Sequence, residues 1–165
     1  MDLRAFNAEP AERLRPTLSA CCDVDRWVDS VLAGRPYDDL AALTAVADRT
    51  VSTFDDAEVE KALAAHPRIG DRASGVTTEA AWSRDEQSGV GEDTAVRAAL
   101  AEGNRLYEER FGRVFLVFAS GRTEAELLAA ARERLGNDEE TERAVVAGEL
   151  RRIALLRLER LVDER

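Results

Sequence analysis

The 165-residue chain has few histidine, lysine and cysteine residues, and each shortage excludes a class of site. With one histidine, His66, the usual His-rich metal centres are not expected, and a Ser-His-Asp triad could form only around this residue. Because Lys61 is the only lysine, the positive groups for an anionic ligand must come from arginine. The two cysteines, Cys21 and Cys22, are adjacent, which disfavours a disulfide between them and agrees with a reducing, cytoplasmic setting.

Long apolar runs are also lacking, so we expect neither a transmembrane span nor a signal peptide. Asp and Glu number 33 against 23 Lys and Arg, which gives a net charge of −10. A surface this acidic repels nucleic-acid phosphates and anionic membranes, so neither is an expected partner. The length suits one domain, which we expect to span residues 1–165.

The four prolines and ten glycines fall mostly between segments whose apolar residues recur with helical spacing. This pattern predicts an all-α, single-domain bundle of about eight helices. Their expected ranges are about 10–21, 24–32, 39–54, 56–64, 78–87, 94–111, 123–135 and 137–162. Residues 113–119 form the only strand-like run, and since it has no partner strand we expect a short extended segment buried between helices.

His66 is the first candidate for chemistry, because histidine is the side chain whose unperturbed pKa lies near neutrality. Pro67 disfavours helix at the residue before it, so His66 is expected where a helix ends and an ordered loop over residues 66–77 begins. Its position alone leaves two alternatives open, a packing or surface histidine and a catalytic one.

The second candidate is one face of the helix expected near residues 78–87. Trp82, Ser83, Glu86 and Gln87 are spaced so that they share that face. A carboxylate beside a tryptophan can have a raised pKa and take part in proton transfer. The alternative is an exposed polar face that Trp82 alone anchors to the core.

Arg157 is the third candidate, because it interrupts an apolar stripe on the last helix. The other members of that stripe are Val146, Leu150, Ile153 and Leu161. A guanidinium in such a place can bind an anionic ligand, or its stem can pack while its head reaches water. Asn104 is expected to form a hydrogen bond inside the bundle. No glycine-rich phosphate loop and no metal-ligand spacing is present, so no metal is expected.

These residues stand in blocks that resemble the OHCU decarboxylases, the 2-oxo-4-hydroxy-4-carboxy-5-ureidoimidazoline decarboxylases of urate breakdown. The blocks occur in family order over nearly the whole chain: AHPRIG at 65–70, AWSRDEQSG at 81–89, NRLYEERFG at 104–112, FLV at 115–117, RLGN at 134–137 and ELRRIALLRL at 149–158. The histidine block together with the Ser-x-x-Glu-Gln block is the most specific part of the resemblance.

The resemblance implies an all-helical, cofactor-free enzyme that converts this small ureidoimidazoline to (S)-allantoin and carbon dioxide, and it is compatible with a homodimer. It implies that His66 and Glu86 are catalytic, without deciding which of them donates the proton. It also implies a set of substrate-binding residues, which are Pro67, Ser83, Gln87, the main chain of Val117, and Arg157.

Two other hypotheses compete with this one. In the first, the same scaffold and residues act on a different ureide or imidazoline, and only substrate assays would tell the two apart. In the second, the chain is a non-catalytic helical interaction module whose pocket is filled by side chains. A third class, nucleic-acid binding, is disfavoured because the sequence has no basic stripe.

Overall fold

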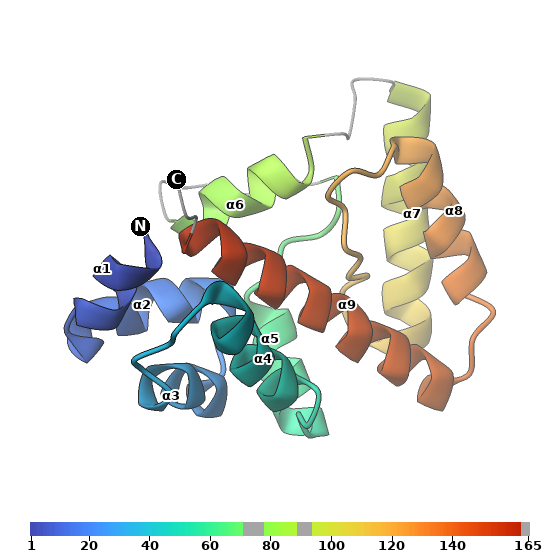
Figure 1. The fold of residues 1–165 in the computed structure, drawn as a ribbon. Helices are drawn as coiled ribbons and strands as arrows, with labels where there is room; N and C mark the ends of the chain where they lie inside the picture. The colour runs from blue at the N-terminus through green and yellow to red at the C-terminus, as the bar shows by residue number, and fades with distance from the viewer. Residues whose placement is uncertain (71–77, 89–93, 163–165) are drawn as a thin grey trace. The chain divides into compact units, whose positions relative to one another are not determined.

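The computed structural model describes residues 1–70, 78–88 and 94–162, which form α-helices and connecting loops without a β-strand (Figure 1). The nine helices of these residues are α1 (Leu3–Ala8), α2 (Ala11–Cys21), α3 (Asp25–Ala33), α4 (Leu40–Val51), α5 (Asp56–Ala64), α6 (Thr78–Glu86), α7 (Thr94–Phe111), α8 (Glu124–Arg134) and α9 (Glu139–Leu161). The prediction of an all-α fold is confirmed. No described helix combines the length and the apolar character needed to cross a lipid bilayer.

Helices α2 to α9 agree with the predicted ranges to within three residues at each end. Helix α1 was missed, because six residues are too few for a repeating apolar stripe. The signal that could have found it is Asp2, whose side chain caps α1 by accepting a hydrogen bond from the N–H of Ala5. Residues 66–70 of the predicted loop are non-helical, and residues 71–77 lie outside the described part of the chain.

The helices divide between two compact units. The first unit consists of Met1–Ala65 and Leu150–Arg165, and the second of His66–Glu149. Helix α9 therefore begins in the second unit and ends in the first. One domain over residues 1–165 stays a prediction.

The first unit is built around Trp27, which is fully buried. Its indole Nε1 donates a hydrogen bond of 3.1 Å to the carbonyl of Ala47 and so joins α3 to α4. Cys21 and Cys22 are both buried free thiols, in agreement with the expectation that they form no disulfide with each other. Burial is the main cause that raises the pKa of Cys22 to about 12, so this thiol stays protonated at neutral pH.

The core of the second unit gathers segments that are distant in the sequence. Ile69, Tyr107, Phe115, Val117 and Leu127 belong to one buried apolar cluster. This cluster brings the loop after His66, helix α7, the predicted extended segment and helix α8 into a common core. Residues 114–119 have no regular secondary structure, although Phe115, Leu116 and Val117 are buried, as predicted for that segment.

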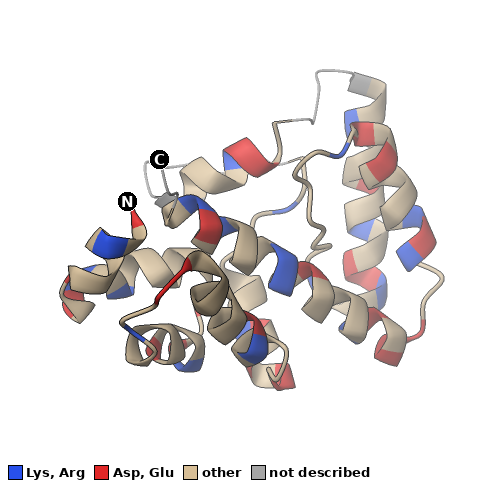
Figure 2. Ribbon diagram, in the orientation of Figure 1, with Lys and Arg blue, Asp and Glu red and all other residues tan. Residues whose placement is uncertain are grey.

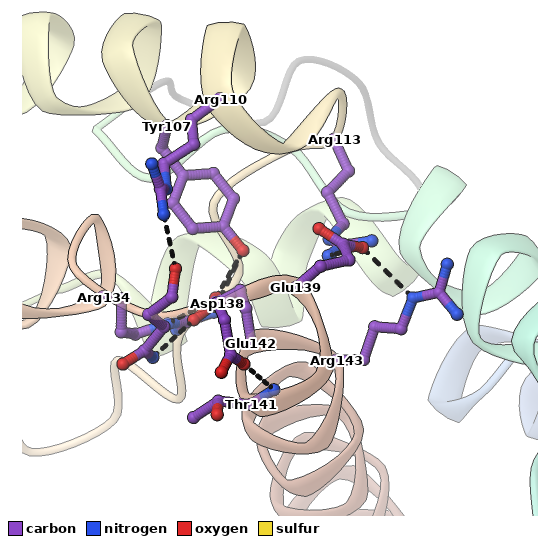
Figure 3. A network of polar contacts seen from close by, with 10 residues as sticks. Tyr107, Arg110, Arg113, Arg134, Asp138, Glu139, Thr141, Glu142 and Arg143 are labelled. Carbon is purple, nitrogen blue, oxygen red and sulfur yellow. Dashed lines mark hydrogen bonds and ion pairs between the residues drawn. The ribbon is translucent and has the colours of Figure 1, made fainter.

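A buried polar network crosses this second core (Figure 3). The carboxylate of Glu142, on α9, is completely buried and accepts hydrogen bonds from the Tyr107 hydroxyl, the Arg134 guanidinium and the Asn137 amide. Arg134 also donates a hydrogen bond to the carbonyl of Leu116. The network thus joins α7, α8 and α9 to the extended segment.

Burial, together with the hydrogen bond to Glu142, raises the pKa of Tyr107 to about 12 from its ordinary value of 10.0. An unfolded tyrosine ionises at lower pH than the folded one, so the free energy of unfolding should fall as the pH rises from 10 to 12. We expect this fall to be less steep in Tyr107→Phe, measured by urea denaturation along a pH series. Tyr37, whose pKa burial also raises, should account for part of the remaining slope. If the free energy of unfolding fell equally steeply with pH in the wild type and in Tyr107→Phe, the raised pKa of Tyr107 would be contradicted.

Candidate active site

His66 lies two residues beyond the end of α5. Helix α5 begins with a capping box in which Asp55 and Glu58 each accept a hydrogen bond from the other's main-chain N–H. The chain leaves the helix at Ala65, as the proline after His66 predicts, and His66 and Pro67 are both half-buried. The imidazole therefore stands on a non-helical segment, at the first residue of the second unit.

Helix α6 presents a buried polar face. Ser83 and Glu86 are only 4% and 8% exposed, whereas Arg84 and Asp85 between them are exposed. Trp82 is half-buried. The alternative of an exposed polar face with a single aromatic anchor is therefore wrong for this helix, because a hydroxyl and a carboxylate are the groups that the fold encloses.

Two side chains hold the described part of the histidine loop, residues 66–70, by its main chain. Gln87 Oε1 accepts a hydrogen bond of 2.9 Å from the N–H of Gly70, and Asn104 Nδ2 donates one of 2.8 Å to the carbonyl of Ile69. Asn104 is buried, so the expectation of a hydrogen bond inside the bundle is confirmed. The loop is thereby fixed to the end of α6 and to α7.

An ion pair, which the sequence did not point to, supports the same loop. The guanidinium of Arg68 donates two hydrogen bonds to the carboxylate of Glu108, one turn beyond Asn104 on α7. This contact holds the pKa of Glu108 below its ordinary value. The two partners are 40 residues apart in the sequence. The ion pair could therefore be predicted only once it is known that α7 lies beside the loop.

Val117 and Arg157 are both buried, at 5% and 2% exposure, and belong to different units. Arg157 donates a hydrogen bond of 3.2 Å to the carbonyl of Ala20 within the first unit. Its guanidinium does not reach water, so the alternative of a head that snorkels to solvent is wrong. The other predicted site residues, His66, Pro67, Ser83, Glu86, Gln87 and Val117, belong to the second unit.

The charges outside this region are mixed. Acidic and basic positions are interspersed along α7, α8 and α9 (Figure 2). Over residues 1–70, 78–88 and 94–162, no three His, Cys, Asp or Glu side chains gather where they could hold a metal ion. The chemistry that the second unit offers is an imidazole and a carboxylate for proton transfer, with a hydroxyl, an amide and main-chain groups for binding.

A comparison with known protein families identifies the family of this chain. The sequence pattern of the family described as OHCU decarboxylase matches residues 7–159. The chain belongs to the OHCU decarboxylase family. Within that family, the predicted residues from His66 to Arg157 all fall inside the matched range.

Individual relatives agree with the family match. The uric acid degradation bifunctional protein TTL of Arabidopsis thaliana is 32% identical over 149 residues, which are 88% of this chain and 46% of that protein. The 2-oxo-4-hydroxy-4-carboxy-5-ureidoimidazoline decarboxylase of Amia calva is 30% identical over 167 residues, covering 99% of this chain and 95% of that one. The chain spans about half, or less, of the length of the bifunctional relatives that it matches.

A solved structure supports the fold of this family member. The crystal structure of an OHCU decarboxylase in the presence of (S)-allantoin matches with a TM-score of 0.75 at 26% identity. The match covers 93% of this chain and 99% of that one.

Gly70 offers a test of the loop's conformation in this family member. Its φ of +88° is strained for residues with a side chain, and a Cβ there would meet nothing within 4 Å. Gly70→Ala should therefore lower the free energy of unfolding by about 1–2 kcal/mol through backbone strain alone. It should also lower kcat/KM, because the Gly70 N–H binds Gln87.

Gly148→Ala is the matched control. Gly148 lies within α9, where a Cβ also meets nothing within 4 Å, so alanine should be neutral or stabilising by up to about 1 kcal/mol. Urea denaturation of both variants measures the difference. Equal stabilities would show that the loop does not need a left-handed residue.

Proposed function

We propose that this chain decarboxylates 2-oxo-4-hydroxy-4-carboxy-5-ureidoimidazoline to (S)-allantoin and carbon dioxide in urate degradation. The observation that carries the proposal is the buried Ser83–Glu86 face of α6, joined through Gln87 to the loop that begins with His66. The names of the Arabidopsis thaliana and Amia calva relatives support the pathway and the substrate.

The reaction suits this set of side chains. When the bond to the carboxylate carbon breaks, its electron pair remains with the ring, where the conjugated imine and carbonyl groups of the substrate can hold it. The reaction as proposed therefore needs no cofactor. What the protein must supply is orientation of the leaving carboxylate, exclusion of water and delivery of one proton to one face of the ring.

We assign these tasks to the residues that the resemblance indicated. His66 and Glu86 position the leaving carboxylate and handle the proton, because they are the imidazole and the enclosed carboxylate of this region. Ser83, Gln87 and the Val117 main chain bind the ring and the ureido group, and Pro67 forms part of the wall. Arg157 binds a polar edge of the ligand through its planar guanidinium.

Proton delivery to one face produces a single enantiomer, for which the resemblance supports the S form. The proposal extends to a cytoplasmic setting, supported by the two free cysteines, and to a homodimer, supported by the family resemblance.

The proposal is tested by generating the unstable substrate from urate with upstream enzymes and following circular dichroism as allantoin forms. The wild-type chain should speed the reaction and produce one enantiomer. His66→Asn and Glu86→Gln should each lower kcat at least about 100-fold, because proton transfer by a placed group contributes roughly 10²–10⁴-fold.

Asp85→Asn is the matched control for Glu86→Gln, since Asp85 is an exposed carboxylate on the same helix. It should leave the rate unchanged. A wild-type chain that behaves like buffer would refute the decarboxylase and favour the interaction module. A full rate in His66→Asn would refute the assigned chemistry while leaving the family membership intact.

A further inference from the structure

We propose that Glu149 and Arg134 are positioning residues that aim the main chain of Val117 at the substrate. This inference rests on the proposed function, because it gives Val117 a ligand to bind. It adds two side chains that do not belong to the predicted site and that act through the peptide groups on either side of Val117.

The two peptide groups flanking Val117 are each held from their outer side. Arg134 donates to the carbonyl of Leu116, and the N–H of Phe118 donates to the carboxylate of Glu149. Both peptide bonds are trans, so within each of them the C=O and the N–H point in opposite directions. The N–H of Val117 therefore points away from Arg134, and its C=O points away from Glu149.

This leaves one donor and one acceptor on a buried residue. Val117 is 5% exposed, and within the described part of the chain neither its N–H nor its C=O has a hydrogen-bond partner. Buried main-chain groups are almost always paired, so a missing partner needs an explanation. A cyclic ureide, whose ring carries N–H and C=O groups side by side, can pair with both.

The Arg134 side of this arrangement is rigid. Its guanidinium lies over the rings of Phe115 and Tyr107, at 4.7 and 5.5 Å from their centroids. Its Nε donates a hydrogen bond of 2.8 Å to Glu142 (Figure 3). A buried ion pair commonly stabilises a fold no more than apolar residues of the same volume would. Its effect here is to fix one N–H on the Leu116 carbonyl.

The Glu149 side is more open to substitution. Glu149 is half-buried and stands on α9, one residue before the first unit resumes at Leu150. Without the Glu149 carboxylate, the Phe118 N–H loses this acceptor. The peptide group between Val117 and Phe118 can then rotate, so the Val117 carbonyl is no longer held in one orientation. Glutamine preserves the acceptor, because its amide oxygen can take the same hydrogen bond.

The test compares Glu149→Ala with Glu149→Gln, using Glu140→Ala, an exposed carboxylate on the same helix, as control. In Glu149→Ala we expect KM for the substrate and Kd for (S)-allantoin to rise about tenfold, the effect of weakening one hydrogen bond between the Val117 carbonyl and the ligand. The kcat should change less than about threefold, because the contact binds substrate and transition state alike. Glu149→Gln should recover KM to within about twofold. Glu140→Ala should leave both constants unchanged.

Arg134→Lys provides a second variant, which retains a positive charge for Glu142 but lacks the planar fork that reaches two acceptors. Arg134→Lys should raise KM about fivefold. In nuclear magnetic resonance spectra, (S)-allantoin should change the chemical shift of the Val117 amide in the wild type, and this change should be absent in Arg134→Lys. Unchanged KM in both Glu149→Ala and Arg134→Lys would overturn the inference, as would a failure of Glu149→Gln to restore binding. A wild-type chain that neither reacts nor binds (S)-allantoin would instead overturn the proposed function.

Discussion

The second unit depends on one buried carboxylate. Glu142 has no exposed surface, and an isolated charge in that place would cost several kcal/mol. Hydrogen bonds from Tyr107, Arg134 and Asn137 offset that cost, and they come from two neighbouring helices and the loop before α9. The carboxylate therefore requires its partners to be in place, and this requirement determines how α7 and α8 meet the start of α9.

The pairing of Glu142 with Arg134 also fixes the main chain of the extended segment. Arg134 cannot move without leaving Glu142 buried and poorly paired, so its bond to the Leu116 carbonyl is fixed as well. A segment without ladder hydrogen bonds would otherwise have several accessible conformations. The proposed binding of a small ureide through main-chain groups needs one conformation, because a displaced contact costs binding and rate.

Side chains also hold the main chain of the histidine loop in place, but they are different from those of the Glu142 network. Asn104 and Gln87 hold the main chain at Ile69 and Gly70, and Arg68 holds the outer side through Glu108. Asn104 and Glu108 lie on helix α7, and Gln87 directly follows α6, so the contacts join the loop to elements more rigid than itself. The groups proposed for proton transfer are thus free to differ chemically from those that set the backbone, and substitutions of the two kinds should have separable effects.

The sequence by itself determined eight of the nine described helices and, through the family resemblance, the candidate site residues. Apolar spacing is a local property, so eight helical ranges, the shared helix face of Ser83 and Glu86, and the place of His66 at a helix end were all readable from neighbours in the chain. Whether that face is buried or exposed was left open by the sequence and was decided by the structure. Only the tertiary structure decided which charges became internal. In the sequence, Glu142 looks like any acidic residue in the first turn of a helix, and Arg134 looks like any basic residue in the last turn. Their burial depends on hydrogen bonds with Tyr107 and Leu116. These two residues are distant in the sequence and are brought near only by folding.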